Sequence, residues 1–371
     1  MIRIMFLCDL GSPWQVTLVK KFLEVDPDSL IVYPKIINNT SAYISLEKEA
    51  LTGPLKAAYL KKQVKIVRVE NRLLYRVLAA PKAVRTIAAE YRPDIVFSLY
   101  GGYLSYLMMQ AGNYRKATYF VGSDILLGGF FKTKIYNQLL LRHLDISFFN
   151  GKHLLDRVQK YYKKSNMVTS YIGLDVKEFN IESRLGGKNR LYICTRGFTD
   201  LYNNDFIINA LSHMDLVASG SSFVFTSSGP NLEASIALAD QLIDSENRLR
   251  IRFLGGVDRS ELVDLLSEAS IYVSMSKSDG ASVSLWEAML SKCYPVLSNI
   301  PANNEWKFGA NMLSIDLDDS KFLAKELERS MNSFDEFGDV LEKNRKLVIK
   351  KASITRSVNN IRRQIIKRVL T

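Results

Sequence analysis

The sequence predicts an α/β protein made of two doubly wound parallel sheets, and three observations support this. Short apolar runs alternate with longer amphipathic segments along nearly the whole chain, as strands and helices do in such sheets. The alternation stops once, at the polar, glycine-containing stretch 182–189, and then resumes. The chain has 371 residues, of which 47% are hydrophobic and 24% charged, so it is large and apolar enough for two domains.

The first half contains most of the predicted strands. These are Ile2–Leu7, Leu30–Tyr33, Val64–Val69, 94–98, 117–121, 145–149 and 167–171, with a helix at Trp14–Leu23. The uncharged run Ile95–Tyr114 is long enough for a membrane span, but its strand-like start and its two glycines favour a buried strand, turn and helix. We therefore expect a first domain over residues 1–182.

The second half repeats the pattern. Its predicted strands are Leu191–Thr195, Ser222–Thr226, Leu249–Leu254, Ile271–Met275 and Tyr294–Leu297. Its predicted helices are Asp205–Leu211, Leu232–Leu242, Arg259–Glu268, a helix after the loop 276–282, Phe322–Ser330 and Ala352–Val369. We expect a second domain over residues 183–351, followed by the terminal helix.

The net charge of +12 comes entirely from residues 1–180, and much of it lies between Lys56 and Arg92. Arg72 and Arg76 are four apart, so they would share one face of a helix. Such a stretch fits an anionic membrane surface, and a solvated face is the close alternative. Nucleic acid is not expected as a partner, because no nucleic-acid-binding signature accompanies the charge.

The cysteines indicate a reducing compartment. Cys8, Cys194 and Cys293 lie in or beside apolar strand-like runs, are odd in number and lack the spacing of metal ligands, so buried thiols are expected. Asp9 interrupts the first apolar run too early for a signal peptide. We expect a cytoplasmic location, at the inner face of the plasma membrane if the basic stretch binds lipid.

Residues 271–308 carry the strongest functional signal. A strand (Ile271–Met275), a small polar loop, an apolar helix and a second strand (Tyr294–Leu297) form a βαβ unit, whose loop lies where such units bind ligands. Free N–H groups at the start of the helix favour an anion such as a diphosphate. Glu287 is the one acid of this apolar helix, and a ribose with two hydroxyls would satisfy it. An ordinary buried βαβ unit with a capped helix is the alternative.

This stretch resembles the signature of glycosyltransferase family 4, the retaining nucleotide-sugar transferases of GT-B fold, in the form of a bacterial polysaccharide-assembly branch. The matching residues are Asp279, then after seven residues Glu287, Ala288 and Met289, and later Pro295 and Val296. The family usually has Glu at the position of Asp279. The resemblance implies two Rossmann-like domains facing a central cleft, with the last helix (about 352–371) returning to the first domain.

The resemblance also implies a donor site in the second half. Arg196 would bind the donor diphosphate, Glu287 the ribose and Asp279 the sugar hydroxyls. The other implied donor contacts are Gly229, Gly280, Ser282, Val283 and Ser284. The family has a Lys five residues after the Arg, but this chain has Leu201, so Lys277 is a candidate substitute.

In the first half the resemblance implies acceptor or cleft contacts from Gly11, Ser12, Gly122 and Ser123. Asp124 would orient the sugar or acceptor, or else cap a helix. The family's His before this glycine is replaced by Val121, so general acid–base work by His is not available there.

We therefore expect a metal-independent, cofactor-free enzyme that transfers a sugar from a UDP- or GDP-linked donor to an acceptor hydroxyl. The basic first half suggests a lipid-linked acceptor, as for an O-antigen or capsule precursor. Two rival functions are a nucleotide-sugar 2-epimerase of the same fold and a non-catalytic subunit that binds a nucleotide sugar or an anionic polymer.

Overall fold

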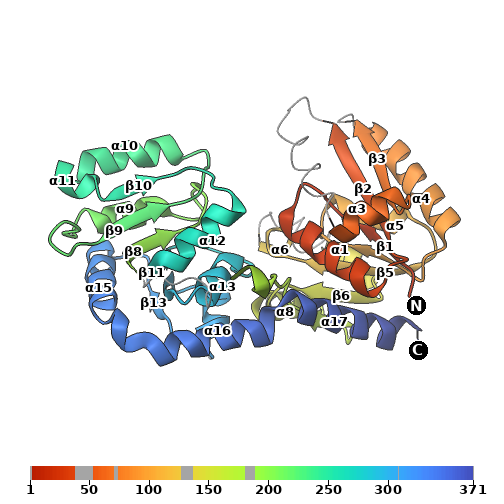
Figure 1. Ribbon diagram of the computed structural model, residues 1–371. Helices are drawn as coiled ribbons and strands as arrows, with labels where there is room; N and C mark the ends of the chain where they lie inside the picture. Colours follow the sequence, from red (N-terminus) through yellow and green to blue (C-terminus); the bar gives the residue numbers. More distant parts are fainter. Residues whose placement is uncertain are drawn as a thin grey trace. The chain divides into compact units, whose positions relative to one another are not determined.

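The computed structural model describes residues 2–37, 53–70, 74–126, 137–179, 189–307 and 309–370. The chain divides into two compact units, Met1–Leu174 with Ala352–Thr371 and Asp175–Lys351 (Figure 1). Arg72 and, apart from Asn189, the predicted linking stretch 182–189 lie outside the described residues.

The first unit contains a seven-stranded parallel sheet in the order β3-β2-β1-β4-β5-β6-β7. Its strands are β1 (Ile4–Leu7), β2 (Leu30–Ile37), β3 (Val64–Glu70), β4 (Ile95–Ser98), β5 (Arg115–Phe120), β6 (Ile146–Phe149) and β7 (Met167–Thr169). Its helices are α1 (Pro13–Val25), α3 (Gly53–Leu60), a π-helical turn η1 (Tyr75–Ala79), α4 (Ala80–Tyr91), α5 (Tyr103–Gln110), α6 (Ser123–Leu126), α7 (Asn137–Arg142), α8 (Lys152–Gln159), α17 (Ile354–Ile365) and η6 (Ile366–Leu370).

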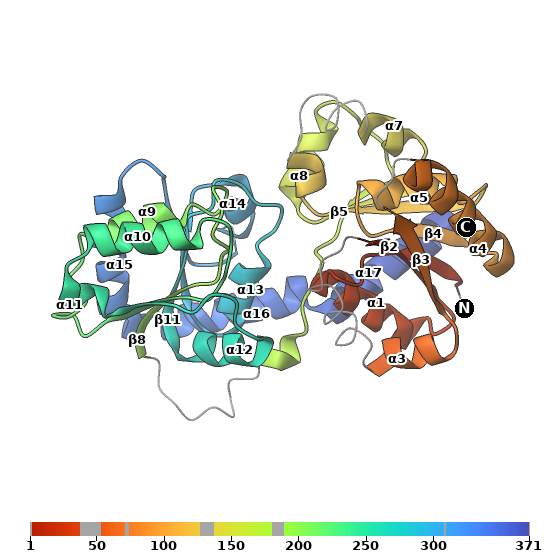
Figure 2. The ribbon, with the colours of Figure 1, turned by 90° about the horizontal axis from the view of Figure 1, so that it is seen from above.

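Helices cover both faces of this sheet, because its central strands are apolar on both sides. In β1, Ile4 and Phe6 face α1, α3 and α17, whereas Met5 and Leu7 face α4 and α5 (Figure 2). This two-residue alternation assigns each side chain of the strand to one of two cores. The run after Ile95, considered above as a membrane span, forms β4 and α5 as predicted. No helix in the described part of the chain is both long and apolar enough to span a bilayer.

The second unit contains a six-stranded parallel sheet in the order β10-β9-β8-β11-β12-β13. Its strands are β8 (Asn189–Cys194), β9 (Ser222–Phe225), β10 (Ile251–Phe253), β11 (Ala269–Ser274), β12 (Tyr294–Ser298) and β13 (Leu313–Ile315). Its helices are η3 (Val176–Phe179), α9 (Asn204–Leu211), α10 (Leu232–Leu242), α11 (Ser245–Arg248), α12 (Arg259–Glu268), α13 (Val283–Leu290), α14 (Pro301–Lys307), α15 (Ser320–Asn332), η5 (Phe334–Phe337) and α16 (Gly338–Ala352).

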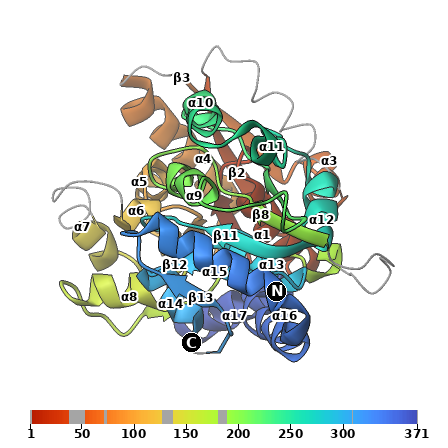
Figure 3. The ribbon, with the colours of Figure 1, turned by 90° about the vertical axis from the view of Figure 1, so that its left-hand side faces the viewer.

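One face of the second sheet is covered by α9, which lies between α10 and α15 (Figure 3). The two parallel sheets confirm the predicted fold class. In this unit the sequence pattern did not predict α16, nor β13, α11 and α14, which are short and lack a clear hydrophobic period.

The helix predicted over Ala352–Val369 is present as α17 followed directly by η6. The extended backbone of Ser353 separates α17 from α16, which the sequence pattern did not predict. The break allows Leu174 to hydrogen-bond the backbone on both sides, donating to Ala352 and accepting from Ile354 at 2.9 Å each. The predicted return of the last helix is confirmed, because α17 packs on α1 and its Arg362 forms a bidentate ion pair with the fully buried Asp26.

Candidate functional site

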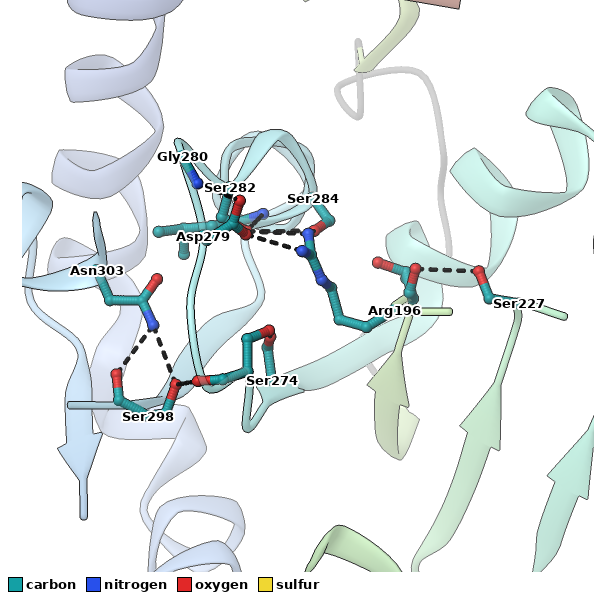
Figure 4. A network of polar contacts seen from close by, with 12 residues as sticks. Arg196, Ser227, Ser274, Asp279, Gly280, Ser282, Ser284, Ser298 and Asn303 are labelled. Carbon is teal, nitrogen blue, oxygen red and sulfur yellow. Dashed lines mark hydrogen bonds and ion pairs between the residues drawn. The ribbon is translucent and has the colours of Figure 1, made fainter. Parts of the chain in front are cut away.

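Polar side chains gather where the central strands of the second sheet end (Figure 4). Arg196 follows β8, Ser227 follows β9 and Asp279 follows β11, and these strands are neighbours or next neighbours in the sheet. Because parallel strands end at one edge, residues distant in the sequence meet there. The loops are tied together: Ser227 donates to the Thr195 carbonyl at 3.2 Å.

Arg196 is the centre of this cluster. Its Nη2 forms an ion pair with Asp279 Oδ2 at 2.8 Å, and its Nη1 donates to Ser284 Oγ at 2.8 Å. The guanidinium also lies over the ring of Tyr202, 4.0 Å from its centroid. Only 10% of the Arg196 side chain is exposed, and its Nε has no hydrogen-bond acceptor. The structure therefore holds a buried, rigid cation with one donor left unused.

The amino end of α13 lies beside this cation. Ser282 caps the helix by accepting from the Leu285 N–H at 3.3 Å, and its hydroxyl is also within 3.5 Å of Arg196 Nη1. The N–H groups of Val283 and Ser284 belong to the first turn, where no helical carbonyl accepts them. The loop before the cap is fixed by the Gly280 N–H, which donates to Asp279 Oδ1 at 2.8 Å. The predicted donor residues after β11 are thus brought together with Arg196.

Glu287 has a partner that the sequence pattern did not indicate. Its Oε1 lies 2.5 Å from Nη1 of Arg259, the first residue of α12. Arg259 also pairs with Glu178 of η3 at 2.8 Å and lies over the Phe179 ring. Burial raises the pKa of the Glu287 carboxyl, and Arg259 offsets only part of this effect. Arg259 therefore already satisfies the Glu287 carboxylate in this structure, and the predicted contact of Glu287 with a ribose stays a prediction.

Arg259 and Tyr202 are the site residues that sequence reasoning missed. The sequence contains one signal for Arg259. A cation at the first position of a helix faces the positive end of the helix dipole, which is unfavourable without an acid nearby. The sequence contains no such signal for Tyr202, because the stacking of its ring on Arg196 depends on the path of the loop after β8.

The loops after β8 and β9 touch at Gly229. A Cβ added there would lie 2.3 Å from the Phe198 carbonyl oxygen, so only glycine allows this approach. The predicted contact of Gly229 with the donor stays a prediction, whereas its packing role is evident. Lys277 lies beside Leu201, because the Lys277 N–H donates to the Leu201 carbonyl at 2.8 Å, and the Lys277 side chain is exposed.

The first unit has a pocket of about 480 Å³ at the carboxyl edge of its sheet. The residues that line it come from the ends of β1, β2, β4 and β5 and from the helices that follow: Asp9, Ser12, Trp14, Gln15, Tyr33, Pro34, Lys35, Tyr100, Tyr103, Leu104, Val121 and Ser123. Gly11 is part of the turn on one side, where its N–H donates to Asp9 Oδ1 at 2.8 Å. Ser123 on the other side hydrogen-bonds the Tyr100 hydroxyl at 2.9 Å. Two of the predicted acceptor residues, Ser12 and Ser123, therefore line one pocket.

Asp124 does not line this pocket. It is 1% exposed, and its carboxylate accepts from the N–H groups of Gly101, Val121 and Gly122 at 2.9–3.2 Å. Burial raises the pKa of Asp124, and these hydrogen bonds act in the opposite direction. The carboxylate thus joins the loop after β4 to the loop after β5, and its predicted contact with a sugar or acceptor stays a prediction. It is not a helix cap, because it lies inside α6.

The sequence was compared with known protein families and with curated proteins. Residues 191–333 match the family described as glycosyl transferases group 1. No curated protein sequence matches the chain.

Solved structures share the fold over nearly the whole chain. HepE from Anabaena, in complex with UDP-glucose, has 13% identity and a TM-score of 0.76 over 99% of this chain and 100% of its own. A glycosyltransferase from Rickettsia africae ESF-5 has 16% identity and a TM-score of 0.76 over 100% of this chain and 99% of its own. An E. coli structure described as trehalose-6-phosphate bound with UDP-2-fluoro glucose has 11% identity and a TM-score of 0.71 over 98% of each chain. The fold and the group 1 domain together support a glycosyltransferase of GT-B fold.

Proposed function

We propose that this chain is a retaining glycosyltransferase of family 4, which moves a sugar from a UDP- or GDP-linked donor to a hydroxyl of a lipid-linked or cell-surface glycan precursor. The observation that carries the proposal is Arg196, a nine-tenths buried guanidinium with an unused donor beside the amino end of α13. Negative charge builds on the diphosphate as the sugar leaves, and fixed donors of this kind stabilise it. The UDP-sugar complexes of HepE and of the E. coli neighbour support this type of donor.

Each residue of the cluster takes one part of the donor. Arg196 and the N–H groups of Val283 and Ser284 hold the diphosphate, and Glu287 accepts from the ribose hydroxyls. Asp279 holds sugar hydroxyls, and because it is one methylene shorter than the usual Glu it moves that contact by roughly 1 Å, which alters substrate choice. No metal is needed in this scheme, because the arginine and the helix end supply the positive charge.

The ion pairs at this edge give a further cation a role. Five charged side chains form two groups, Arg196 with Asp279, and Arg259 with Glu287 and Glu178. Because the two cations are already paired with three anions, a further cation would strengthen the attraction that Arg196 and the helix end exert on a diphosphate. Lys277 provides that charge from the position beside Leu201, and we assign it the place of the absent family lysine.

The pocket of the first unit suits an acceptor that carries sugar. Trp14, Tyr33, Tyr100 and Tyr103 give it aromatic surfaces against which the apolar face of a sugar ring packs. Ser12 and Ser123 add hydroxyls that fix orientation. Aromatic walls with a few polar groups are the usual composition of small-molecule sites, and we assign the acceptor to this pocket.

The test uses Arg196→Ala, with Arg248→Ala as the matched control, since Arg248 forms an ion pair of similar length with Asp240 in the same unit. UDP- and GDP-sugars are screened by thermal shift, and the donor that binds is incubated with lipid-linked sugar acceptors. We expect Arg196→Ala to lose transfer about a hundredfold or more, as for removal of an oxyanion donor, and Arg248→Ala to keep it. Full transfer by Arg196→Ala contradicts the proposal. Epimer formation without acceptor indicates the 2-epimerase, and donor binding with neither transfer nor hydrolysis indicates the binding subunit.

A further inference from the structure

The helix formed by η1 and α4 exposes an apolar end. Leu74, Val77 and Leu78 are 75%, 44% and 64% exposed. The opposite side of the helix is buried in the first unit through Ala80, Pro81, Val84 and Ala88. Large aliphatic side chains of this exposure, adjacent on one turn, form a patch and not a scatter of single surface residues.

Cations continue the same face. Leu74, Leu78, Lys82 and Arg85 follow one another at spacings of four, four and three residues, which places them in one row along a helix. Lys82 and Arg85 are exposed, and the first acid of the described helix is Glu90, more than a turn further on. Exposed apolar side chains with cations beside them are the residue types that bind an anionic membrane interface.

This face is joined to the proposed acceptor pocket. The hydroxyl of Tyr103 donates to the Arg76 carbonyl at 2.9 Å, and the hydroxyl of Tyr106 donates to the Val77 carbonyl at 3.1 Å. The Arg76 guanidinium lies over the Tyr103 ring, 4.8 Å from its centroid. Tyr103 also lines the pocket, and α4 packs beside α5 (Figures 1 and 2). One side chain therefore separates the exposed turn from the pocket.

Charge decides between a bilayer and a protein as the partner. Residues 1–180 account for the whole net charge of +12, and Lys82 and Arg85 place part of it directly after the leucines. Anionic lipid attracts each such cation while the leucines enter the acyl boundary. The excess of positive charge around this patch therefore favours an anionic bilayer over an uncharged apolar groove.

We propose that Leu74, Val77, Leu78, Lys82 and Arg85 form a docking surface for an anionic lipid bilayer. Leu74 and Leu78 enter the acyl region, and Lys82 and Arg85 remain at the head groups. The second part of the inference rests on the proposed function: docking by this surface lets a lipid-linked acceptor keep its tail in the bilayer while its head group reaches the pocket past Tyr103.

Vesicle co-sedimentation of the full chain tests the surface, with phosphatidylcholine alone and with phosphatidylglycerol added. The double variant Leu74→Ser/Leu78→Ser should bind mixed vesicles at least about tenfold more weakly, because two leucine side chains no longer leave water. Lys82→Glu should weaken binding roughly tenfold on the mixed vesicles only. Leu249→Ser is the control, because Leu249 is 84% exposed in the second unit, and it should bind as the wild type does.

A fluorescent label gives a second readout. The three native cysteines are buried, so Leu78→Cys and Leu249→Cys can each be labelled with an environment-sensitive dye. We expect a blue shift on mixed vesicles at position 78 and none at position 249. Wild-type binding by the double serine variant, equal loss in Leu249→Ser, or no vesicle binding by the wild type overturns the surface, the last outcome leaving a protein partner. Donor binding by the double variant, measured with UDP and GDP, reports separately on the proposed function, because these residues lie outside the donor site.

Discussion

Breaking the ion pair between Arg196 and Asp279 should lower the stability of the second unit and raise its affinity for a nucleoside diphosphate. Two unit charges roughly 4 Å apart attract by about 4 kcal/mol at an effective dielectric constant near 20. In Asp279→Asn this attraction is lost, while the amide keeps one hydrogen bond to the guanidinium and is cheaper to bury than a carboxylate. With 10% and 16% of the two side chains exposed, we expect a net loss of about 2 kcal/mol in the stability of the second unit.

Binding should change in the other direction. In the wild type a diphosphate must share Arg196 with Asp279, whereas in the variant the guanidinium is free to bind it. We expect UDP or GDP to bind up to about tenfold more tightly, which adds about 1.4 kcal/mol of stabilisation at saturating ligand. Sugar transfer should nevertheless fall, because the sugar hydroxyls lose their carboxylate. We therefore expect Asp279→Asn to bind the nucleotide product more tightly and to transfer the sugar more slowly than the wild type.

Scanning calorimetry with and without nucleotide measures both effects. For a unit of this size a loss of about 2 kcal/mol lowers the melting temperature by about 4–8 °C. The control is Asp240→Asn, which breaks the 2.6 Å pair with Arg248, where Asp240 is 57% exposed; this should cost less than about 1 kcal/mol. An unchanged melting temperature in Asp279→Asn, or nucleotide that stabilises the variant less than the wild type, would refute the reasoning.

The remaining predictions concern single residues of the second unit. Lys277→Gln should weaken UDP or GDP binding about tenfold and leave the nucleoside unaffected, while the exposed Lys321→Gln changes neither; equal loss for diphosphate and nucleoside would argue against a phosphate contact. Because the raised pKa of Glu287 keeps its proton in the folded chain after the unfolded chain has lost it, stability falls as pH rises above about 4.5. Glu287→Gln should remove this part of the slope in denaturant titrations across that range, and an identical slope would sink the assignment. Gly229→Ala should destabilise by about 1–3 kcal/mol through its backbone clash, whereas Gly338→Ala, which meets no atom within 4 Å, should be nearly neutral in the same titration.

Much of the order of strands and helices could be predicted, because the spacing of apolar residues within each segment indicates its secondary structure. The run Ile4–Leu7 is apolar at every position, as a strand covered on both faces must be, and α12 begins after Asp258 because that carboxylate caps it. In the second unit the short elements β13, α11 and α14 escaped prediction, since three to seven residues carry too little period. The longer α16 was not predicted either. The extended backbone at Ser353 depends on Leu174, which is distant in the sequence.

The candidate site was predictable by residue type but not by pairing. The sequence identified Glu287 as an acid that its apolar surroundings must satisfy, and the family resemblance pointed to Arg196 and Asp279. It could not indicate that Arg196 pairs with Asp279 or that Glu287 pairs with Arg259, because each pair joins two strand–helix units through the order of strands in the sheet. Asp124 shows the same limit, since its three N–H donors come from two loops.

These pairings bear on how the proposed donor site works. Arg196 and Glu287 are held in place before any donor arrives, so binding does not have to order them, and preorganisation of this kind lowers the cost of stabilising the transition state. The counterions have a second effect. Asp279 partly cancels the charge that a diphosphate needs, so the ground-state complex is bound less tightly than a bare arginine would bind it. Under the proposed function, the negative charge that builds on the leaving diphosphate would be attracted more strongly to Arg196 and Lys277, while sugar hydroxyls engage Asp279. The site would then bind the transition state more tightly than the ground state. On this reasoning Asp279 serves turnover as well as donor choice, because it keeps the nucleotide product from binding too tightly to leave.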